Sequence, residues 1–306
     1  MWQLAIPALL LQLGAYFGIY AISRAPLISS FASELHLLGT LLMLSVLPTY
    51  LLCIWLFLYR ETRRTLKELK PLSESSSQVE QRMHHFHWIV WLILPLSIIF
   101  GVVQNEYVID AIWAGRTFAA IDIAVFLGNT FLWAVVGLTY AWRIPLSMAV
   151  GRYGRSLEID LYAMHTVRPL TQLATKDVLV VAGALALTPL QALDAEFRWV
   201  NYESGVIVAV PAAIMLLLIP LWGVRGAILQ AKAAKLESLQ KKLNAADPED
   251  VDQLETLCAH RDRIRAQSNW PFDAAMVLRL FFYAVIAPMA WVGAALVENL
   301  VDRFTG

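Results

Sequence analysis

The fold is decided by Gly205–Ala245, which reads GVIVAVPAAIMLLLIPLW followed by GVRGAILQAKAAKLESLQKKLNA. The first part is almost purely apolar and is long enough to cross a bilayer as an α-helix that rises about 1.5 Å per residue. The second part is charged but contains no strong helix breaker, and Leu229, Leu236 and Leu243 recur every seven residues. The stretch therefore predicts one helix that crosses the membrane and continues well beyond it.

A second helix is expected to return along the first. Asp247 followed by Pro248 is typical of a helix start, with the Asp as cap and the Pro at the first helical position. An apolar stripe from Val251 to Ile264 gives this helix a face that can pack on its neighbour. The two helices together predict a helical hairpin over residues 226–270.

Composition places the chain among membrane proteins. Hydrophobic residues make up 58% of it and charged residues 16%, and the mean hydropathy is +0.58, which is too apolar for a soluble domain of this size. The apolar runs are continuous and do not alternate, which excludes a β-barrel. We expect an all-α, polytopic transmembrane helical bundle of about seven spans. These are residues 4–23, 36–59, 88–104, 117–142, 177–193, 205–224 and 275–297.

Charge placement orients these spans. The loops 60–87, 143–176 and 225–274 hold 19 of the 24 Lys and Arg residues, against four on the opposite side. The positive-inside rule then places these loops in the cytoplasm, with the N-terminus inside and the C-terminus outside. Residues 1–23 have a second interpretation as a signal peptide, but no positive segment precedes their apolar run, so we favour a retained helix.

Three parts follow from this topology. Residues 1–225 form the transmembrane bundle with two basic cytoplasmic loops, residues 226–270 form the cytoplasmic hairpin, and residues 271–306 form a final transmembrane helix with a short outer tail. Within the second loop, residues 157–161 alternate like a strand, although a short amphipathic helix fits the same pattern.

The span near 117–142 carries the most informative polar residues. An acid, an amide and two aromatic residues recur at helical spacing, so they share one face. Polar groups are costly in lipid, so this face is expected to look into the bundle or a watery path. The acid has a second explanation, because it lies near the outer end of the span and can reach the interface. The candidate pore-lining residues are Asp122, Phe126, Asn129 and Trp133.

The outer loops are acidic and contain few bases, so they would concentrate cations at the mouth of a pore. The candidate residues of this outer acidic mouth are Asp110, Glu196 and Glu203.

The predicted cytoplasmic face offers many bases to an anion. Lipid head groups are the ordinary partner of such bases, and a polyanionic ligand is the alternative. The candidate ligand-binding residues are Arg152, Arg155, Lys241, Lys242, Arg261, Arg263 and Arg265.

Enzyme motifs are missing from the sequence. It has no His-Glu-x-x-His, no Gly-x-Ser-x-Gly, no Walker sequence and no paired Cys motif. His84, His85 and His87 lie close together, but no carboxylate or Cys completes a zinc ligand set, so we expect an interfacial polar cluster. We therefore expect no catalytic residues, no metal and no cofactor. Gly14 and Gly18 form a small-xxx-small pair that allows close helix packing.

One segment resembles a known group of proteins. The run Asn269-Trp270-Pro271-Phe272-Asp273 is followed by Arg279-Leu280-Phe281, Tyr283, Pro288, Trp291-Val292-Gly293 and Glu298. This pattern resembles the C-terminal segment of bacterial inner-membrane proteins, some of which are encoded beside antiphage defence genes. The plan of several spans, a cytoplasmic hairpin and no enzyme motif is similar to the membrane effector of the Hailong antiphage system.

This resemblance implies an oligomeric, ligand-regulated ion channel of a bacterial inner membrane, with a tetramer favoured. Its opening would disrupt the membrane of an infected cell. The resemblance also implies a partner nucleotidyltransferase whose single-stranded DNA oligomers hold the channel shut. Two other functions stay open at this point: a structural or assembly protein that docks a cytoplasmic partner through its hairpin, and a secondary transporter.

Overall fold

The computed structural model describes residues 2–23, 34–70, 79–81, 88–115, 117–191, 200–247, 249–271, 278 and 282. All regular elements in these ranges are helical, which confirms the all-α prediction for this part of the chain. Two short 3-10 helices, η2 and η3, flank helix α7. The elements are α1 (Trp2–Ser23), α2 (Glu34–Leu69), α4 (Val90–Val103), α5 (Glu106–Trp113), α6 (Ala120–Arg155), η2 (Met164–Val167), α7 (Arg168–Leu187), η3 (Thr188–Gln191), α8 (Val200–Ala245) and α9 (Val251–Ala266).

Long apolar helices indicate a membrane protein. Two apolar stretches, Ala5–Tyr20 in α1 and Val90–Val103 in α4, are shorter than a typical membrane span. The predicted span 275–297 lies almost wholly outside the described residues, so the count of seven spans stays a prediction. Four described stretches are long and apolar enough to cross a bilayer: Leu37–Leu69, Ala120–Arg155, Met164–Gln191 and Glu203–Ala245.

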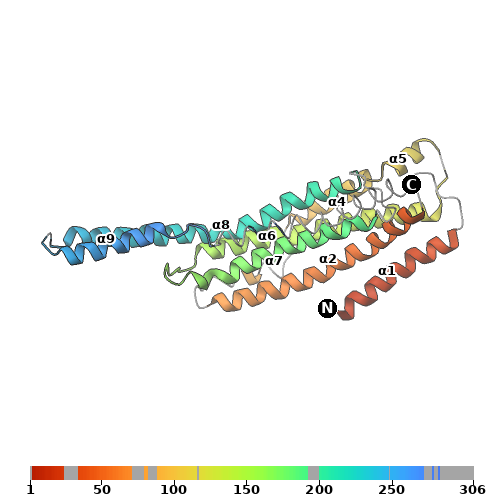
Figure 1. The fold of residues 1–306 in the computed structure, drawn as a ribbon. Coiled ribbons are helices and arrows are strands. Elements are labelled where there is room, and N and C mark those ends of the chain that lie inside the picture. The colour runs from red at the N-terminus through yellow and green to blue at the C-terminus, as the bar shows by residue number, and fades with distance from the viewer. Residues whose placement is uncertain are drawn as a thin grey trace, which may run out of the picture.

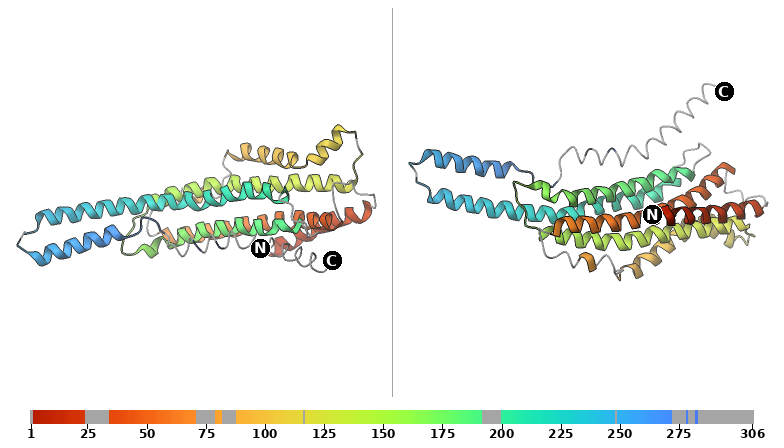
Figure 2. Two further views of the ribbon diagram at one scale, coloured as in Figure 1. Left: turned by 45° about the horizontal axis from the view of Figure 1, so that its top comes forward. Right: turned by 90° about the horizontal axis from the view of Figure 1, so that it is seen from below.

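The centre of the molecule is a bundle of α2, α6, α7 and α8 (Figures 1 and 2). Helices α2, α6 and α8 run in one direction and α7 runs back between them. The hydroxyl of Tyr50 in α2, for example, donates to the carbonyl of Val180 in α7 at 3.0 Å. Helix α1 packs against α2 and α6, and α4 packs along the side of α6. This arrangement leaves an interior between four helices.

The helices are longer than the apolar runs that predicted them. Helix α2 continues to Leu69, and α6 and α7 take up most of the predicted loop 143–176. Residues 157–160, which join them, have no regular structure, so neither a strand nor a helix forms there. Buried apolar residues such as Leu66 and Leu170 continue the core at this end, which explains why the helices do not stop at the predicted membrane boundary.

The hairpin consists of the second half of α8 and α9, which packs back along it (Figures 1 and 2). Its predicted helix start at Pro248 is wrong: α9 begins at Val251. The carboxylate of Asp250 accepts the amide of Gln253 at 3.0 Å and caps the helix, whereas Asp247 accepts the amide of Glu249 within the turn. The side of the membrane on which the hairpin lies stays a prediction.

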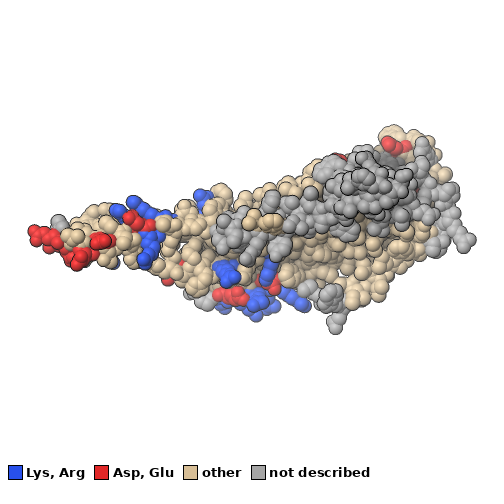
Figure 3. Space-filling view, viewed as in Figure 1, with Lys and Arg blue, Asp and Glu red and all other residues tan. Residues whose placement is uncertain are grey.

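Large apolar side chains cover the outside of the bundle. Trp91 of α4 is 83% exposed, Leu11 of α1 is 75% exposed and Ile207 of α8 is 66% exposed. Figure 3 shows Lys, Arg, Asp and Glu gathered over the hairpin and the adjoining end of the bundle. Exposed apolar side chains beside such a charged end are the surface expected of helices that face lipid.

Candidate functional site

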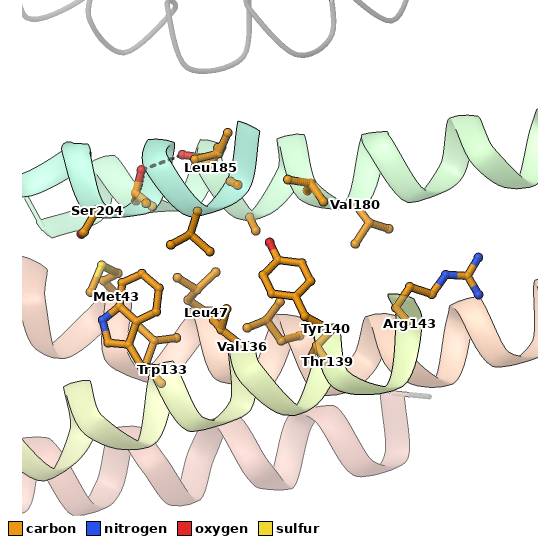
Figure 4. A pocket seen from close by; sticks show the side chains of 18 of the residues that line it. Met43, Leu47, Trp133, Val136, Thr139, Tyr140, Arg143, Val180, Leu185 and Ser204 are labelled. Atoms are coloured by element: carbon orange, nitrogen blue, oxygen red, sulfur yellow. Dashed lines mark hydrogen bonds between the residues drawn. The ribbon is translucent and has the colours of Figure 1, made fainter. Parts of the chain in front are cut away.

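The four central helices enclose a cavity of about 270 Å³, shown in Figure 4. Its walls are mostly apolar, with Met43 and Leu47 from α2, Val136 from α6, Val180 from α7 and Val208 from α8. A water molecule takes up about 30 Å³ in the liquid, so the cavity has room for several waters or a small ligand.

Polar side chains lie at both ends of the cavity and along its middle. Arg143 (Figure 4) and its partner Asp177 lie at the inner end, by which we mean the end nearer the hairpin. Tyr140 points from α6 into the space between the helices (Figure 4). The arrangement offers hydrogen-bonding groups at intervals along an otherwise apolar path. The outer end contains Gln104, Asn129, Gln191 and Ser204, and Thr139 and Tyr140 lie between the two ends.

The inner end is closed by a buried ion pair. Arg143 Nε donates to Asp177 Oδ1 at 2.8 Å, and its Nη2 donates to Asp177 Oδ2 at 2.7 Å. A third donor, Nη1, reaches the hydroxyl of Thr62 at 2.9 Å. Arg143 is 2% exposed and Asp177 is 1% exposed. A bidentate ion pair of this kind is a strong interaction. Burial has removed the water that would otherwise hydrate the two charges, so the stability of the pair depends on every one of these contacts.

Neighbouring contacts fix the position of this pair. Lys176, next to Asp177, pairs with Glu61, next to Thr62, so α7 and α2 are joined twice at this level. The ring of Trp142 packs on that of Trp55, with centroids 5.7 Å apart. Three helices thus hold the pair at one height of the bundle.

The sequence patterns miss this ion pair. Arg143 and Asp177 stand 34 residues apart, at the boundary between predicted spans and a predicted loop, where Arg143 counts as an ordinary cytoplasmic base. The available signal is that one charge ends an apolar run and the opposite charge begins the next. Antiparallel neighbours bring such positions together.

Two of the four predicted pore-lining residues line the cavity. These are Asn129 and Trp133. The ring of Trp133 packs edge to face on that of Phe100 in α4, with the ring centroids 4.5 Å apart. Phe126 is not among the lining residues. Asp122 is fully buried in the first turn of α6, where its Oδ2 accepts the Ala119 amide at 3.0 Å and complements the helix dipole.

The cavity ends before the level of Asp122 because apolar side chains fill the bundle there. Leu37 and Leu41 of α2 pack with Ile121 and Val125 of α6 in a buried cluster. Asp122 and Phe126 therefore do not line the cavity together with Asn129 and Trp133. A pore role for Asn129 and Trp133 stays a prediction.

The structure describes two of the three residues predicted to form the outer acidic mouth. Asp110 lies exposed on α5, and Glu203 lies half-buried in the first turn of α8. Glu196 lies outside the described residues.

The seven predicted ligand-binding bases divide between two surfaces. Arg152 and Arg155 lie beside residues 218–223 of α8, where the two helices cross. Lys241 and Lys242 lie on the same helix about 30 Å further along it, at about 1.5 Å per residue. Arg263 and Arg265 are exposed on α9, while Arg261 is 29% exposed and pairs with Asp262. The bases therefore do not form one site.

Polar contacts tie the base of the hairpin to the bundle. Gln267 Nε2 donates to the carbonyl of Leu161 at 3.0 Å, and Tyr162 is hydrogen-bonded to His260. The hydroxyl of Thr171 donates to the carbonyl of Pro271 at 3.3 Å. Thr171 belongs to α7, the helix that carries Asp177, so the segment that directly follows the hairpin contacts the helix that helps to close the cavity.

Within the described residues, no group of three or more His, Cys, Asp or Glu is placed to hold a metal ion. The histidine cluster at residues 84–87 lies outside them. No known family model, curated protein or solved structure matches the chain.

Proposed function

We propose that the protein is an oligomeric, ligand-regulated ion channel of a bacterial inner membrane, and that the cavity is part of its ion path. The observation that carries this proposal is the cavity itself: it lies between four long apolar helices, has polar groups along its length, and is closed at one end by the Arg143–Asp177 pair. A closed apolar path with polar ends is the arrangement expected of a channel in its shut state.

The ion pair is suited to act as the gate. While the inner end is dry, separating the two charges leaves each of them buried without a partner, which typically costs about 3–5 kcal/mol. Once water enters, hydration of the two charges offsets the contacts that are lost. The inner end therefore has two stable arrangements, a dry one with the charges paired and a wet one with the charges apart.

Regulation is proposed to act through the hairpin. The residues that directly follow it contact α7, because the carbonyl of Pro271 accepts the hydroxyl of Thr171, less than two turns before Asp177 at about 3.6 residues per turn. A ligand that binds the hairpin bases more tightly in one arrangement than in the other shifts the balance between them. The resemblance supports single-stranded DNA oligomers as this ligand, a partner nucleotidyltransferase as their source, a tetramer as the assembly, and membrane disruption in antiphage defence as the outcome.

Two double variants test the gate. Arg143→Ser with Asp177→Ser replaces the pair by small polar groups and lets water reach the inner end. Arg143→Met with Asp177→Leu fills the same space with apolar groups, a replacement that is often neutral or stabilising for a buried pair. In proteoliposomes, we expect the serine variant to raise passive ion flux by about tenfold or more, and the apolar variant to stay at or below wild type. Equal flux from wild type and both folded variants would contradict the proposal.

A scaffold that docks a partner is the second candidate, favoured by the way the hairpin extends away from the bundle (Figures 1 and 3). A scaffold would conduct ions in neither variant, so the same flux measurement separates the two functions. A secondary transporter would instead show saturable flux that depends on one substrate.

A further inference from the structure

Helices α6 and α8 touch through their backbones. A Cβ atom on Gly223 would overlap the carbonyl of Gly151, and a Cβ atom on Gly151 would lie 2.6 Å from the carbonyl oxygen of Ile219. Gly154, one turn further, would meet the amide nitrogen of Val224 at 3.3 Å. The absence of side chains at these positions brings the helices together and leaves a hollow beside the contact.

This hollow is a groove of about 390 Å³. Its wall is apolar along one stretch, with Met148 from α6 and Leu218, Ile219 and Trp222 from α8. Arg152 and Arg155, one turn apart on α6, complete its lining. The groove therefore combines a surface for a hydrocarbon chain with two positive charges.

The positive charges of the groove are not neutralised. Both arginines are exposed, and within the described part of the chain neither forms a hydrogen bond or an ion pair. The side chain of Arg155 lies against α8, with Cγ and Nε each 3.8 Å from the point where a Cβ of Gly226 would stand. It thus spans the crossing between the two helices.

A third arginine lies at the same level of α8. The guanidinium of Arg225 stands over the rings of Trp222, at 5.3 Å, and Trp270, at 4.8 Å. Its Nε is buried and has no hydrogen-bond partner. Arg225 adds positive charge beside the groove. The two tryptophans that it contacts indicate the depth of this level in the membrane.

The apolar belt of α8 ends here. Ile214, Met215 and Trp222 are exposed, and Arg225 follows about one turn after the tryptophan. Tryptophan and arginine at the end of an exposed apolar stretch mark the depth of the lipid head groups. The apolar wall of the groove is then at the depth of acyl chains, and Arg152 and Arg155 are at the depth of phosphates.

We propose that this groove binds an anionic phospholipid, with its phosphate on Arg152 and Arg155 and an acyl chain along Met148, Leu218 and Ile219. The apolar wall favours a lipid over a free phosphate or a nucleotide, which would contact the arginines alone. The lipid fills the hollow beside the glycine contact and holds α6 to α8. The lipid site does not depend on ion conduction, so it can be tested independently of the proposed channel.

Lipid retention by the full-length protein tests the site. The purified protein is titrated with phosphatidylglycerol in detergent, and bound lipid is counted by native mass spectrometry. Each arginine near an anionic surface contributes about fivefold, so Arg152→Gln with Arg155→Gln should weaken binding by about twenty- to thirtyfold. Arg63→Gln with Lys67→Gln removes two exposed charges that pair with none of the described residues, from the corresponding end of α2, and should change binding by less than about twofold. Equal losses in the two variants would overturn the proposal.

Three further arms identify the source of the phosphate. Phosphatidylethanolamine should bind at least about tenfold more weakly than phosphatidylglycerol, and inorganic phosphate should not displace the lipid. Leu218→Trp fills the apolar part of the groove and leaves all charges in place, so a folded variant should lose the lipid as well. Displacement by inorganic phosphate, equal binding of the two lipids, or full retention by a Leu218→Trp variant with wild-type melting would each overturn the proposal.

Discussion

At the residue scale, glycines decide how closely α6 and α8 approach. Gly151 and Gly223 face each other, and the carbonyl of Gly151 occupies the space that a side chain on Gly223 would need. The sequence pattern Gly-Arg-Tyr-Gly-Arg at residues 151–155 lacks the spacing of a phosphate loop, and the structure gives these glycines a packing role instead. A single methyl group is therefore enough to disturb the crossing.

Gly223→Ala should destabilise the protein, by about 1–3 kcal/mol, because the new methyl group forces two backbones apart. Gly226→Ala is the matched control: its Cβ would meet only the side chain of Arg155 at 3.8 Å, and alanine is the better helix former. Thermal unfolding in one detergent should therefore show a lower midpoint for Gly223→Ala and an unchanged or higher one for Gly226→Ala. Identical midpoints for the two variants would show that the crossing relaxes freely.

Single residues also show which contacts could be predicted from the sequence. Helical spacing correctly places Asn129 and Trp133 on the inner face of α6, because that inference needs only local periodicity. The Arg143–Asp177–Thr62 network needs the register of three helices, and its members lie 34 and 81 residues apart. Local patterns do not contain that register: they mark Arg143 and Asp177 as charges at the ends of apolar runs, but they do not show that these two residues and Thr62 meet.

At the element scale, the hairpin depends on one buried lysine. Lys232 of α8 is 8% exposed, and its ammonium donates to the carbonyl of Gln267 and to the side chain of Asn269, both at 2.8 Å, and to the carbonyl of Arg265 at 3.4 Å. These acceptors lie at and just beyond the C-terminus of α9, where a positive charge complements the helix dipole. The lysine thus joins the end of α9 to the middle of α8.

Lys232→Met should loosen α9 while leaving the bundle folded. Hydrogen bonds from a charged donor contribute about 1.5–3 kcal/mol each, and loss of the two short ones should speed amide exchange in α9 by about 100-fold or more. Lys235→Met, which removes an exposed lysine one turn away, is the control and should leave exchange unchanged. Hydrogen–deuterium exchange of the full chain measures both variants. Unchanged protection of α9 in Lys232→Met would remove the anchoring role.

The elements also show which boundaries hydropathy predicts. It identifies α2, α6 and α8 and the continuity of α8 beyond the membrane, because apolar length and the lack of breakers are local properties. It ends α6 and begins α7 in the wrong places, because helical hydrogen bonds continue wherever packing supports them. The Asp247-Pro248 signal fails for a similar reason: Asp250, three residues later, offers the same cap chemistry and is the one used.

At the scale of the whole molecule, α1 presents a surface that the bundle does not use. A Cβ atom added to Gly14 or Gly18 would meet no atom of the described residues within 4 Å. Leu10 and Leu11, on the same face, are 63% and 75% exposed. The small-xxx-small pair predicted for helix packing is therefore free for contact with lipid or with a second copy of the chain.

The predicted homo-oligomer can be tested on this surface. If copies pack through α1, Gly14→Leu with Gly18→Leu should block close approach and reduce the mass of the assembly in nanodiscs. Ala15→Leu adds one leucine at an exposed position turned about 100° from Gly14 and about 60° from Gly18, and should leave the mass unchanged. Native mass spectrometry compares the three proteins. A wild-type monomer at all concentrations would contradict the oligomer, and an unchanged assembly in the double variant would place its interface elsewhere.

The contact between Gly151 and Gly223 divides α8 almost into halves, each about 34 Å long at about 1.5 Å per residue. One half borders the cavity and the other half forms the hairpin. In mechanical terms, the glycine contact is a pivot along α8. We expect a sideways displacement of the hairpin tip to reach the half of α8 that borders the cavity across this pivot, reduced by bending at Pro211 and Pro220.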